Sequence, residues 1–498
     1  MKAKAYFFLS IFSVIILFSA CDDDDNDRRK PGDNTNTANE WIYQQMKGLY
    51  LWNVRSDPNF EQEPDAFFKS LLYKRGQMDG DRFSNIEEIL DNKRKSALST
   101  EKLGFDFTMM SYFKDENQEN SNLGFFVLNV RENTNVGDKG LKRGNVIYAV
   151  NGTAIDYSNY QDIRYYLESA NSISSLSFYD ENGQEKTISD LQGNFSGDAG
   201  NPIWMSKVIE AGIGYIVYNE FERGDNYQYD IDLVKTVKNL VDDGVENMII
   251  DLRYNPGGYV LSATHLASAL VPNRSANDIF VKFAYNSARH DSLTRIYGDT
   301  EKFLDKVYST GQAIPKTNLK SLYILTSENT ASASEALISG LTPYMGTKLK
   351  QVGLITMGKD KGSWTVEDSR FSWKLHPLIM RVLNKNNNSE YGGNYENGIE
   401  PSSGLAVDEL SEGYKLQKAK DGDGNIVYCP LITPWQGGLV ELGNKEEPLL
   451  ATAIADIKGE RRKSILSRSN LTKTVSVKVP IIKNPRKPRM IVEPRISE

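Results

Sequence analysis

The feature that most constrains the fold is a pattern of strand, tight loop and helix that occurs twice in the second half of the chain. In the first copy, the continuous apolar run Asn247–Leu252 leads into Arg253-Tyr254-Asn255-Pro256-Gly257-Gly258 and then into a predicted helix at 259–270. In the second, the apolar segment Leu322–Leu325 precedes a helix that ends near Leu341. Continuous apolar strands are typical of sheets covered on both faces. The pattern predicts a layered α/β core with both loops along one edge.

The second loop is rich in small and hydroxylated residues. It reads Thr-Ser-Glu-Asn-Thr-Ala-Ser-Ala-Ser-Glu over residues 326–335. Such a run between a strand and a helix lifts one serine, Ser332, clear of bulky neighbours, as a nucleophile requires. Lys359 follows Gly358 with 26 residues between it and Ser332. Because lysine can replace histidine as the base of a serine hydrolase, the two residues suggest Ser/Lys chemistry.

Each of these residues also has an ordinary structural interpretation. Ser332 and Glu335 fit a helix capping box, in which the serine only satisfies an unpaired amide. Most lysines are solvated surface charges, so Lys359 alone indicates little. Ser334 is the alternative nucleophile and Lys361 is the alternative base. Both segments follow the Asn-Pro-Gly-Gly loop in the sequence. This order favours the catalytic interpretation, because helix capping does not require such a loop.

A lysine base needs an apolar environment. A free lysine has a pKa near 10.4 and is almost wholly protonated at neutral pH, so Lys359 must be desolvated to expose a neutral amine. Met357 and Trp364 could form an apolar wall beside it. Asp360 would oppose this effect if its carboxylate lay close.

The length of the chain predicts several domains, because 498 residues exceed what one hydrophobic core usually organises. The expected division is a signal peptide at 1–20, a lipidated flexible tether at 21–39, a helical domain at 40–99, a strand-rich module at 103–191, an α/β domain at 200–459 and a basic extension at 460–498. In the extension, Val475–Ile482 could instead add an edge strand. The formal net charge of −7 argues against a general nucleic-acid binder.

The first 21 residues predict export. Lys2 and Lys4 precede a single apolar run, Ala5–Phe18, which is too short for a stable membrane span. The run ends in Leu-Phe-Ser-Ala before Cys21 and resembles a bacterial lipobox, which implies lipid on the Cys21 thiol. The alternative is an ordinary signal peptide with an incidental cysteine. The acidic residues 22–25 resemble signals for surface routing, so we expect a lipid-anchored envelope protein on the periplasmic or surface side, with the outer membrane as its expected location.

The strand-rich module contains a second recognisable segment. Residues 140–152 read Gly-Leu-Lys-Arg-Gly-Asn-Val-Ile-Tyr-Ala-Val-Asn-Gly and closely resemble the core of bacterial PDZ domains. Leu103, Gly104 and Phe105 are similar to the carboxylate-binding loop of those domains. Successive backbone N–H groups in such a loop bind a terminal carboxylate, while a strand edge pairs with the peptide. The alternative is a small β-rich domain that binds nothing.

Taken together, the Asp251–Gly258, Thr330–Glu335 and Thr356–Lys359 segments resemble the C-terminal processing (tail-specific) peptidases. The resemblance covers about 103–456 and implies a mixed α/β fold, with a crotonase-like layered catalytic core, a PDZ-like domain and an N-terminal helical domain. It implies that Ser332 is the nucleophile and Lys359 the general base. It also implies that the backbone N–H groups of Gly258 and Ala333 are the oxyanion donors. No cofactor is implied.

The chain departs from that family pattern at two positions. Many relatives have a glutamine four residues after the lysine, where it orients the base, whereas this chain has Ser363. A late acidic residue of the pattern is replaced by Ser402. Neither change removes the Ser/Lys pair, but the first leaves the orienting group of Lys359 open.

Other kinds of site are poorly supported. The three histidines, His265, His290 and His376, have no metal-binding spacing. The Asp-Gly-Asp-Gly-Asn run at 421–425 lacks the glutamate of a calcium loop, and Cys429 is expected in the core.

The leading hypothesis is an envelope serine endopeptidase that recognises polypeptides with free C-termini through the PDZ-like module and is anchored by its N-terminal lipid. An inactive or weakly active peptide-binding lipoprotein on the same fold is the alternative. Acyl-thioester chemistry, suggested by the crotonase-like core, is a third possibility. The sequence shows no coenzyme-binding feature that such chemistry would need.

Overall fold

The computed structural model describes residues 37–88, 102–198, 200–386, 395–420, 426–433, 437–460 and 489–492. The chain divides into two compact units. The smaller comprises Met1–Arg94 and Thr365–Pro377, and the larger comprises Lys95–Trp364 and Leu378–Glu498. The predicted export signal with Cys21, the segment Val475–Ile482 and the acidic run at 421–425 lie outside the described residues. Within the described ranges, no helix is long and apolar enough to cross a membrane.

The smaller unit combines two helices with a short antiparallel sheet. Its helices are α1 (Thr37–Leu49) and α2 (Pro64–Ser70), and its strands are β1 (Asn85–Glu88), β17 (Val366–Glu367) and β18 (Trp373–His376). The strand order is β1-β18-β17. Trp41 stacks on Phe371 with ring centroids 5.1 Å apart, and both rings belong to the aromatic core of this unit. Residues 365–377, placed by the sequence in the α/β domain, therefore pack with the N-terminal helices instead.

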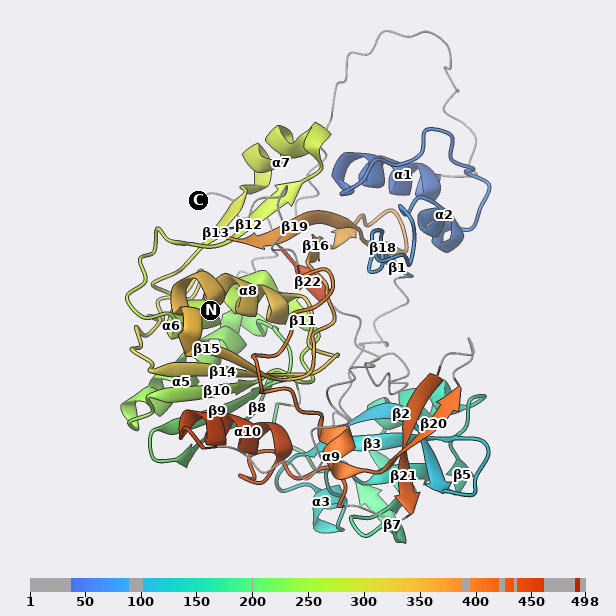
Figure 1. The fold of residues 1–498 in the computed structure, drawn as a ribbon. Coiled ribbons are helices and arrows are strands. Elements are labelled where there is room, and N and C mark those ends of the chain that lie inside the picture. The colour runs from blue at the N-terminus through green and yellow to red at the C-terminus, as the bar shows by residue number, and fades with distance from the viewer. Residues whose placement is uncertain are drawn as a thin grey trace, which may run out of the picture. The chain divides into compact units, whose positions relative to one another are not determined.

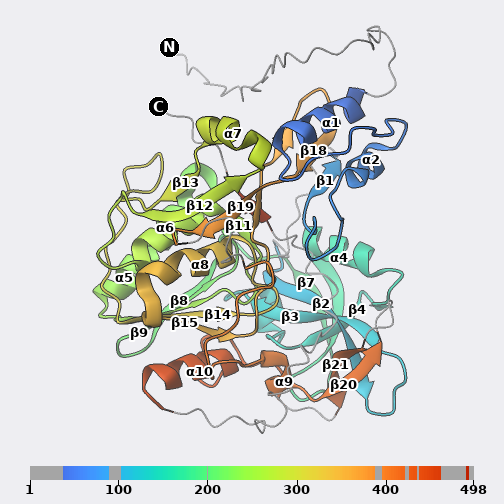
Figure 2. The same ribbon diagram turned by 45° about the horizontal axis from the view of Figure 1, so that its top comes forward.

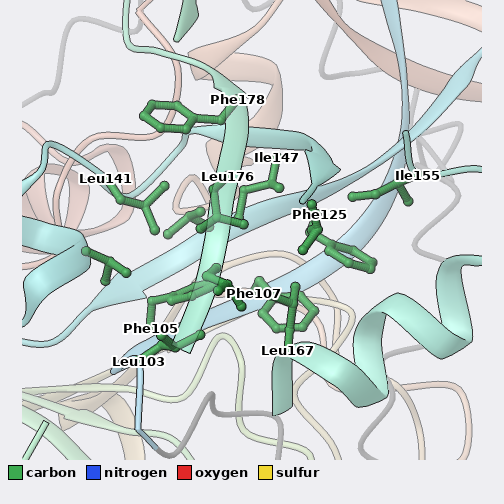
Figure 3. Packing of buried hydrophobic residues seen from close by; sticks show 14 of the residues in the cluster. Leu103, Phe105, Phe107, Phe125, Leu141, Ile147, Ile155, Leu167, Leu176 and Phe178 are labelled. Carbon is green, nitrogen blue, oxygen red and sulfur yellow. The ribbon is translucent and has the colours of Figure 1, made fainter. Parts of the chain in front are cut away.

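The strand-rich module of the larger unit is built on one mixed sheet of order β20-β21-β2-β3-β4-β6-β7. Its core is aromatic and aliphatic, with Phe105, Phe107 and Phe125 packed together (Figure 3). Strands β20 and β21 come from much later in the chain and continue this sheet beyond β2. The elements are β2 (Phe105–Asp115), β3 (Asn122–Val130), α3 (Asn135–Asp138), β4 (Val146–Val150), β5 (Thr153–Ala154), α4 (Tyr160–Ser169), β6 (Ser172–Tyr179), β7 (Glu185–Gln192), β20 (Leu416–Lys420) and β21 (Ile426–Thr433).

The α/β core contains a five-stranded sheet of order β15-β14-β10-β9-β8. Its inner strands are parallel and buried apart from Asn247 and Ser321 at their starts, because helices α6 and α8 cover one face and α10 covers the other (Figures 1 and 2). Ile249 and Tyr323 pack towards α10, as the alternation of side chains in a strand requires. The elements are β8 (Ile203–Glu210), β9 (Ile213–Tyr218), α5 (Gln228–Asp242), β10 (Asn247–Asp251), α6 (Val260–Leu270), β14 (Ser321–Thr326), α8 (Ala333–Met345), β15 (Leu349–Gly353) and α10 (Pro448–Ile457).

A second sheet lies beyond α8 and has the order β11-β22-β16-β19-β12-β13. Strand β22, Arg489–Ile491, belongs to the predicted basic extension, yet it has a strand on each side and is not an edge strand. The other elements are β11 (Gly257–Tyr259), β12 (Ile279–Tyr285), α7 (His290–Tyr297), β13 (Thr300–Lys302), β16 (Lys361–Ser363) and β19 (Leu378–Asn384). Helix α9 (Glu409–Gly413) lies between the strand-rich module and the α/β core. The mixed α/β fold predicted from the sequence is confirmed.

Candidate active site

Ser332 occupies the sharp turn between β14 and α8 and has a strained backbone. It caps α8 with φ 64° and ψ −113°, a conformation that non-glycine residues rarely adopt. Backbone strain of this kind costs on the order of 1–3 kcal/mol and persists only where the surroundings impose it. The turn is held by Thr330, whose hydroxyl donates to the carbonyl of Leu252 at 2.8 Å, and by the Ala331 N–H, which donates to the carbonyl of Asn255 at 3.1 Å.

The hydroxyl of Ser332 is buried and has no hydrogen-bond partner among the described residues. Ser332 and Glu335 are arranged as a capping box, in which the Glu335 carboxylate accepts from the N–H of Ser332 at 2.7 Å. The hydroxyl of Ser334, by contrast, donates to the carbonyl of Asn255 at 3.1 Å. An unengaged hydroxyl suits a nucleophile better than one that is already bound, so the geometry favours Ser332 over Ser334.

Glu335 connects the serine turn to the segment that carries Lys359. Its Oε2 accepts from the backbone N–H of Ser332 at 2.7 Å and from that of Lys359 at 2.8 Å. Its Oε1 accepts from the Gly358 N–H at 2.7 Å and from the Thr356 hydroxyl at 2.5 Å. One buried carboxylate therefore places the backbone nitrogens of Ser332 and Lys359 within hydrogen-bond distance of a single atom.

The environment of Glu335 makes it sensitive to pH. Burial raises the pKa of its carboxyl group to about 7, although its four hydrogen-bond donors act in the opposite direction. Nearby Tyr395 is also buried, and its hydroxyl has no hydrogen-bond partner in the part of the chain that is described. The carboxyl group thus titrates close to neutral pH, directly between the two predicted catalytic residues.

The two candidate bases occupy different environments. Lys359 is 1% exposed, consistent with the desolvation that a lysine base requires. Lys361 is also buried, but its ammonium group contacts Asp360 at 2.7 Å and Glu396 at 2.8 Å. The Lys361 amine is therefore already engaged by two carboxylates. The geometry therefore disfavours Lys361 as a base and shows that Asp360 bonds to Lys361.

The glycine loop lies against the serine turn. Gly257 and Gly258 have φ values of 103° and 135°. A Cβ on Gly257 would lie 2.6 Å from the Cβ of Ser332, and one on Gly258 would lie 2.2 Å from the carbonyl oxygen of Phe221. The first glycine is required by close approach to the nucleophile and the second by close approach to backbone. Gly258 and Ala333, the predicted oxyanion donors, thus lie on segments that meet at Ser332.

The residue that replaces the expected glutamine, Ser363, is mostly buried in β16. Its hydroxyl donates to the backbone carbonyl of Met490 in β22 at 3.2 Å. Trp364, one of the predicted wall residues, packs against Tyr297 with ring centroids 3.8 Å apart. Ser363 is therefore engaged with the C-terminal strand.

Sequence reasoning missed a buried ionic cluster behind the glycine loop. Arg253, which begins that loop, bonds through its guanidinium group to Asp251, Glu447 and Glu409. Arg143 of the strand-rich module donates to the same carboxylate of Glu409. The Asp-Leu-Arg sequence was part of the recognised motif, but nothing local indicates partners that lie more than a hundred residues away.

The predicted carboxylate-binding loop lies at the start of β2. Leu103 and Phe105 are fully buried in the module core, and Gly104 has φ 74° with its carbonyl accepting from the Arg131 N–H. Strand β21 pairs with β2 only at Phe113 and Asp115. Strand β3 pairs with β2 from Phe105 to Tyr112.

Two other candidate groups, His265 and Cys429, are buried in the fold. His265 is buried, with Nδ1 3.3 Å from Asp230, while Nε2 accepts from the Tyr308 N–H. Within the described ranges, no cluster of three or more His, Cys, Asp or Glu side chains could hold a metal ion. Cys429 is buried in β21, and burial raises the pKa of its thiol to about 12. A thiol in that state is a poor nucleophile at neutral pH.

Comparison with known proteins identifies the family of this site. Residues 212–402 match the family model for "Peptidase family S41", and residues 37–85 match the model for "Peptidase S41 N-terminal domain". The chain carries the domains of peptidase family S41. The S41 peptidase match spans the glycine loop, Ser332, Glu335 and Lys359, and it supports a serine-type peptidase.

Solved structures are also similar to this chain. A protein from Bacteroides fragilis assigned as an S41 protease is 24% identical, with a TM-score of 0.61 over 86% of this chain and 99% of that one. The photosystem II D1 C-terminal processing protease is 16% identical, with a TM-score of 0.44 over 76% and 95% of the two chains. The first of these likenesses supports the mixed α/β architecture with an N-terminal domain.

Proposed function

We propose that this S41 chain is a serine endopeptidase in which Ser332 is the nucleophile and Lys359 the general base. The observation that carries the proposal is the single carboxylate of Glu335, which bonds to the backbone N–H groups of both residues. The strained turn at Ser332, its unengaged hydroxyl and the burial of Lys359 support the same assignment.

The proposed reaction has two halves. Ser332 Oγ forms a bond to the carbonyl carbon of a peptide, and its proton passes to Nζ of Lys359. The C–N bond then breaks, and the leaving amine takes that proton from Lys359. Water attacks the resulting ester in the same way, gives a proton to Lys359, and Ser332 regains its proton as the acid product leaves.

Negative charge on the substrate oxygen needs fixed donors. The N–H groups of Gly258 and Ala333 are our candidates, since both segments meet at Ser332. Loss of one such donor typically costs about 10²- to 10³-fold in rate. The start of α8 would add the positive end of its helix dipole.

The proposal also covers how the enzyme recognises its substrates and where in the cell it acts. We propose that the loop at Leu103, Gly104 and Phe105 binds the C-terminus of the peptide, because its sequence is similar to the carboxylate-binding loop of PDZ domains. Lipid on Cys21 would hold the enzyme in the cell envelope, where exported polypeptides are its expected substrates.

The experiment compares hydrolysis of an unstructured protein by the wild type and by variants. Ser332→Ala and Lys359→Ala should each lose at least about 10³-fold in kcat/KM. Ser334→Ala and Lys361→Ala are the matched controls and should retain far more activity. Full activity of Ser332→Ala would contradict the proposal. Peptide binding without hydrolysis, or without phosphonate labelling of Ser332, would favour a binding protein.

A further inference from the structure

The C-terminal strand β22 passes through the candidate active site. It pairs in parallel with β11, where Gly257, Gly258 and Tyr259 lie opposite Arg489, Met490 and Ile491. On its other side it pairs with β16 at Ser363 (Figure 1). Strand β11 contains the proposed oxyanion glycine, and β16 begins two residues after Lys359. One extended segment thus fills a space one strand wide between the two halves of the site.

The backbone of this strand lies next to the nucleophile. A Cβ on Gly257 would lie 2.5 Å from the carbonyl oxygen of Arg489 and 2.6 Å from the Cβ of Ser332. Both atoms therefore border the same small volume above Gly257. A backbone carbonyl oxygen of β22 therefore lies near the side chain of Ser332.

The side chain of Arg489 lies in an acidic setting. Its guanidinium group contacts Glu220 at 2.7 Å and Glu222 at 3.1 Å. These glutamates flank Phe221, whose backbone bonds to both Gly257 and Tyr259 of β11. Two carboxylates fixed to the glycine loop form a subsite that matches a basic side chain in charge.

The residues after Arg489 are apolar and covered. Met490 is fully buried, and Ile491 and Val492 are 7% and 8% exposed. The Ser363 hydroxyl donates to the Met490 carbonyl, and the Val492 N–H donates to the Ser363 carbonyl at 3.3 Å. Strand β16 therefore bonds to the main chain of the segment in this space. The space accepts apolar side chains after the basic side chain.

We propose that the space between β11 and β16 is the substrate-strand site, that Glu220 and Glu222 select a basic residue in it, and that Arg489–Val492 is a competing internal occupant. The substrate class is an extended polypeptide with arginine or lysine followed by apolar residues, with the carbonyl of the basic residue beside Ser332. This inference rests on the proposed peptidase function for its activity measurement only.

The binding test uses the full chain carrying Ser332→Ala and Arg489→Glu, so that the nucleophile is absent and the internal occupant is weakened. The probe is a fluorescein-labelled peptide, Pro-Arg-Met-Ile-Val-Glu, which copies residues 488–493. The control peptide has glutamate in place of arginine. We expect the arginine peptide to bind about tenfold more tightly, in keeping with the charge pairs it would regain. Adding Glu220→Gln and Glu222→Gln should remove that preference, and equal binding of both peptides would overturn the proposal.

The activity test compares the wild type with Arg489→Glu on a quenched peptide that contains Arg-Met-Ile-Val. Release of the internal strand should raise kcat/KM several-fold, mainly by lowering KM. Hydrolysis with no preference for arginine would contradict the acidic subsite and leave the peptidase function standing. Selective binding without hydrolysis by any variant would contradict the peptidase function and leave the binding site standing.

A permanently structural role for β22 makes a different prediction. If the strand is an integral part of the sheet, Arg489→Glu and Met490→Asp should both lower Tm strongly, without raising activity or admitting the peptide. That combined result would overturn the proposal. A modest change in Tm with increased peptide binding would support a displaceable occupant.

Discussion

Arg143 and Arg253 donate to the same oxygen of Glu409, each at 2.6 Å. Arg143 comes from the strand-rich module, and Arg253 begins the glycine loop that reaches Ser332. Burial alone would raise the pKa of the Glu409 carboxyl group, but the two arginines lower it. Glu409 is therefore the ionic connection between the module and the loop. Removal of this charge takes a carboxylate away from both buried guanidinium groups, although Arg253 keeps its bonds to Asp251 and Glu447.

We predict that Glu409→Gln lowers the free energy of unfolding by about 3 kcal/mol at pH 7, because breaking a buried ion pair leaves uncompensated charge. The lowered pKa means that this stabilisation is present above the unfolded value and is lost as pH falls through the folded one. Denaturant unfolding at pH 7 and near pH 3 measures the difference. Glu181→Gln, which removes an exposed pair with Lys142, is the control and should cost less than about 1 kcal/mol.

Glu335 predicts a pH dependence of opposite sign. Its folded pKa of about 7 lies above the unfolded value, so the folded chain holds this proton more tightly between about pH 4.5 and 7. The group therefore lowers the free energy of unfolding by up to about 3 kcal/mol as pH rises through that window. The slope of unfolding free energy against pH should become less negative in Glu335→Gln. The exposed change Glu246→Gln should leave it unaltered, and identical slopes for Glu335→Gln and wild type would refute the assignment.

Gly257 and Gly140 form a matched pair, because their φ values are 103° and 98°. A Cβ on Gly140 meets nothing within 4 Å, whereas one on Gly257 would press on Ser332. Gly140→Ala should cost about 1–3 kcal/mol through backbone strain alone and leave kcat/KM near the wild-type value. Gly257→Ala should in addition lose about a hundredfold in kcat/KM, since small displacements of reacting groups have effects of that size. Equal activities of the two folded variants would contradict a close approach between Gly257 and the nucleophile.

Backbone strain at Ser332 predicts a conflict between stability and activity. Glycine adopts positive φ without a steric penalty, so Ser332→Gly should raise the free energy of unfolding by about 1 kcal/mol while abolishing hydrolysis. Ser332→Ala should abolish hydrolysis without this gain, because alanine keeps the Cβ. Thermal unfolding of the two inactive variants provides the comparison, and greater stability of the alanine variant would show that the turn is unstrained.

The sequence predicted the parts of this molecule that depend on local patterns. The apolar run before the Asn-Pro-Gly-Gly loop became β10, and the small-residue loop led into α8, because strand burial and helix initiation are encoded within about ten residues. The position of β22 could not be predicted in this way. Its three residues carry no periodic signal, and its place between β11 and β16 depends on partners far away in the chain.

The side-chain networks could not be predicted from local sequence patterns either. Glu335 was recognised only as a capping residue, because its bonds to Gly358 and Lys359 require the fold to bring two loops together. The same holds for Glu409, which meets its two arginines only after the module and the core have assembled. The replacement of glutamine by Ser363 could be read from the sequence, whereas its hydrogen bond to β22 could not.

The most direct measurement of the proposed Ser/Lys pair is labelling by a serine-reactive phosphonate, followed by peptide mapping, in the wild type, Lys359→Ala and Lys361→Ala. We predict a single adduct on Ser332 that forms in the wild type and in Lys361→Ala and is slowed by at least about a hundredfold in Lys359→Ala. An adduct on Ser334, or labelling of Ser332 at the wild-type rate without Lys359, would contradict the proposed mechanism.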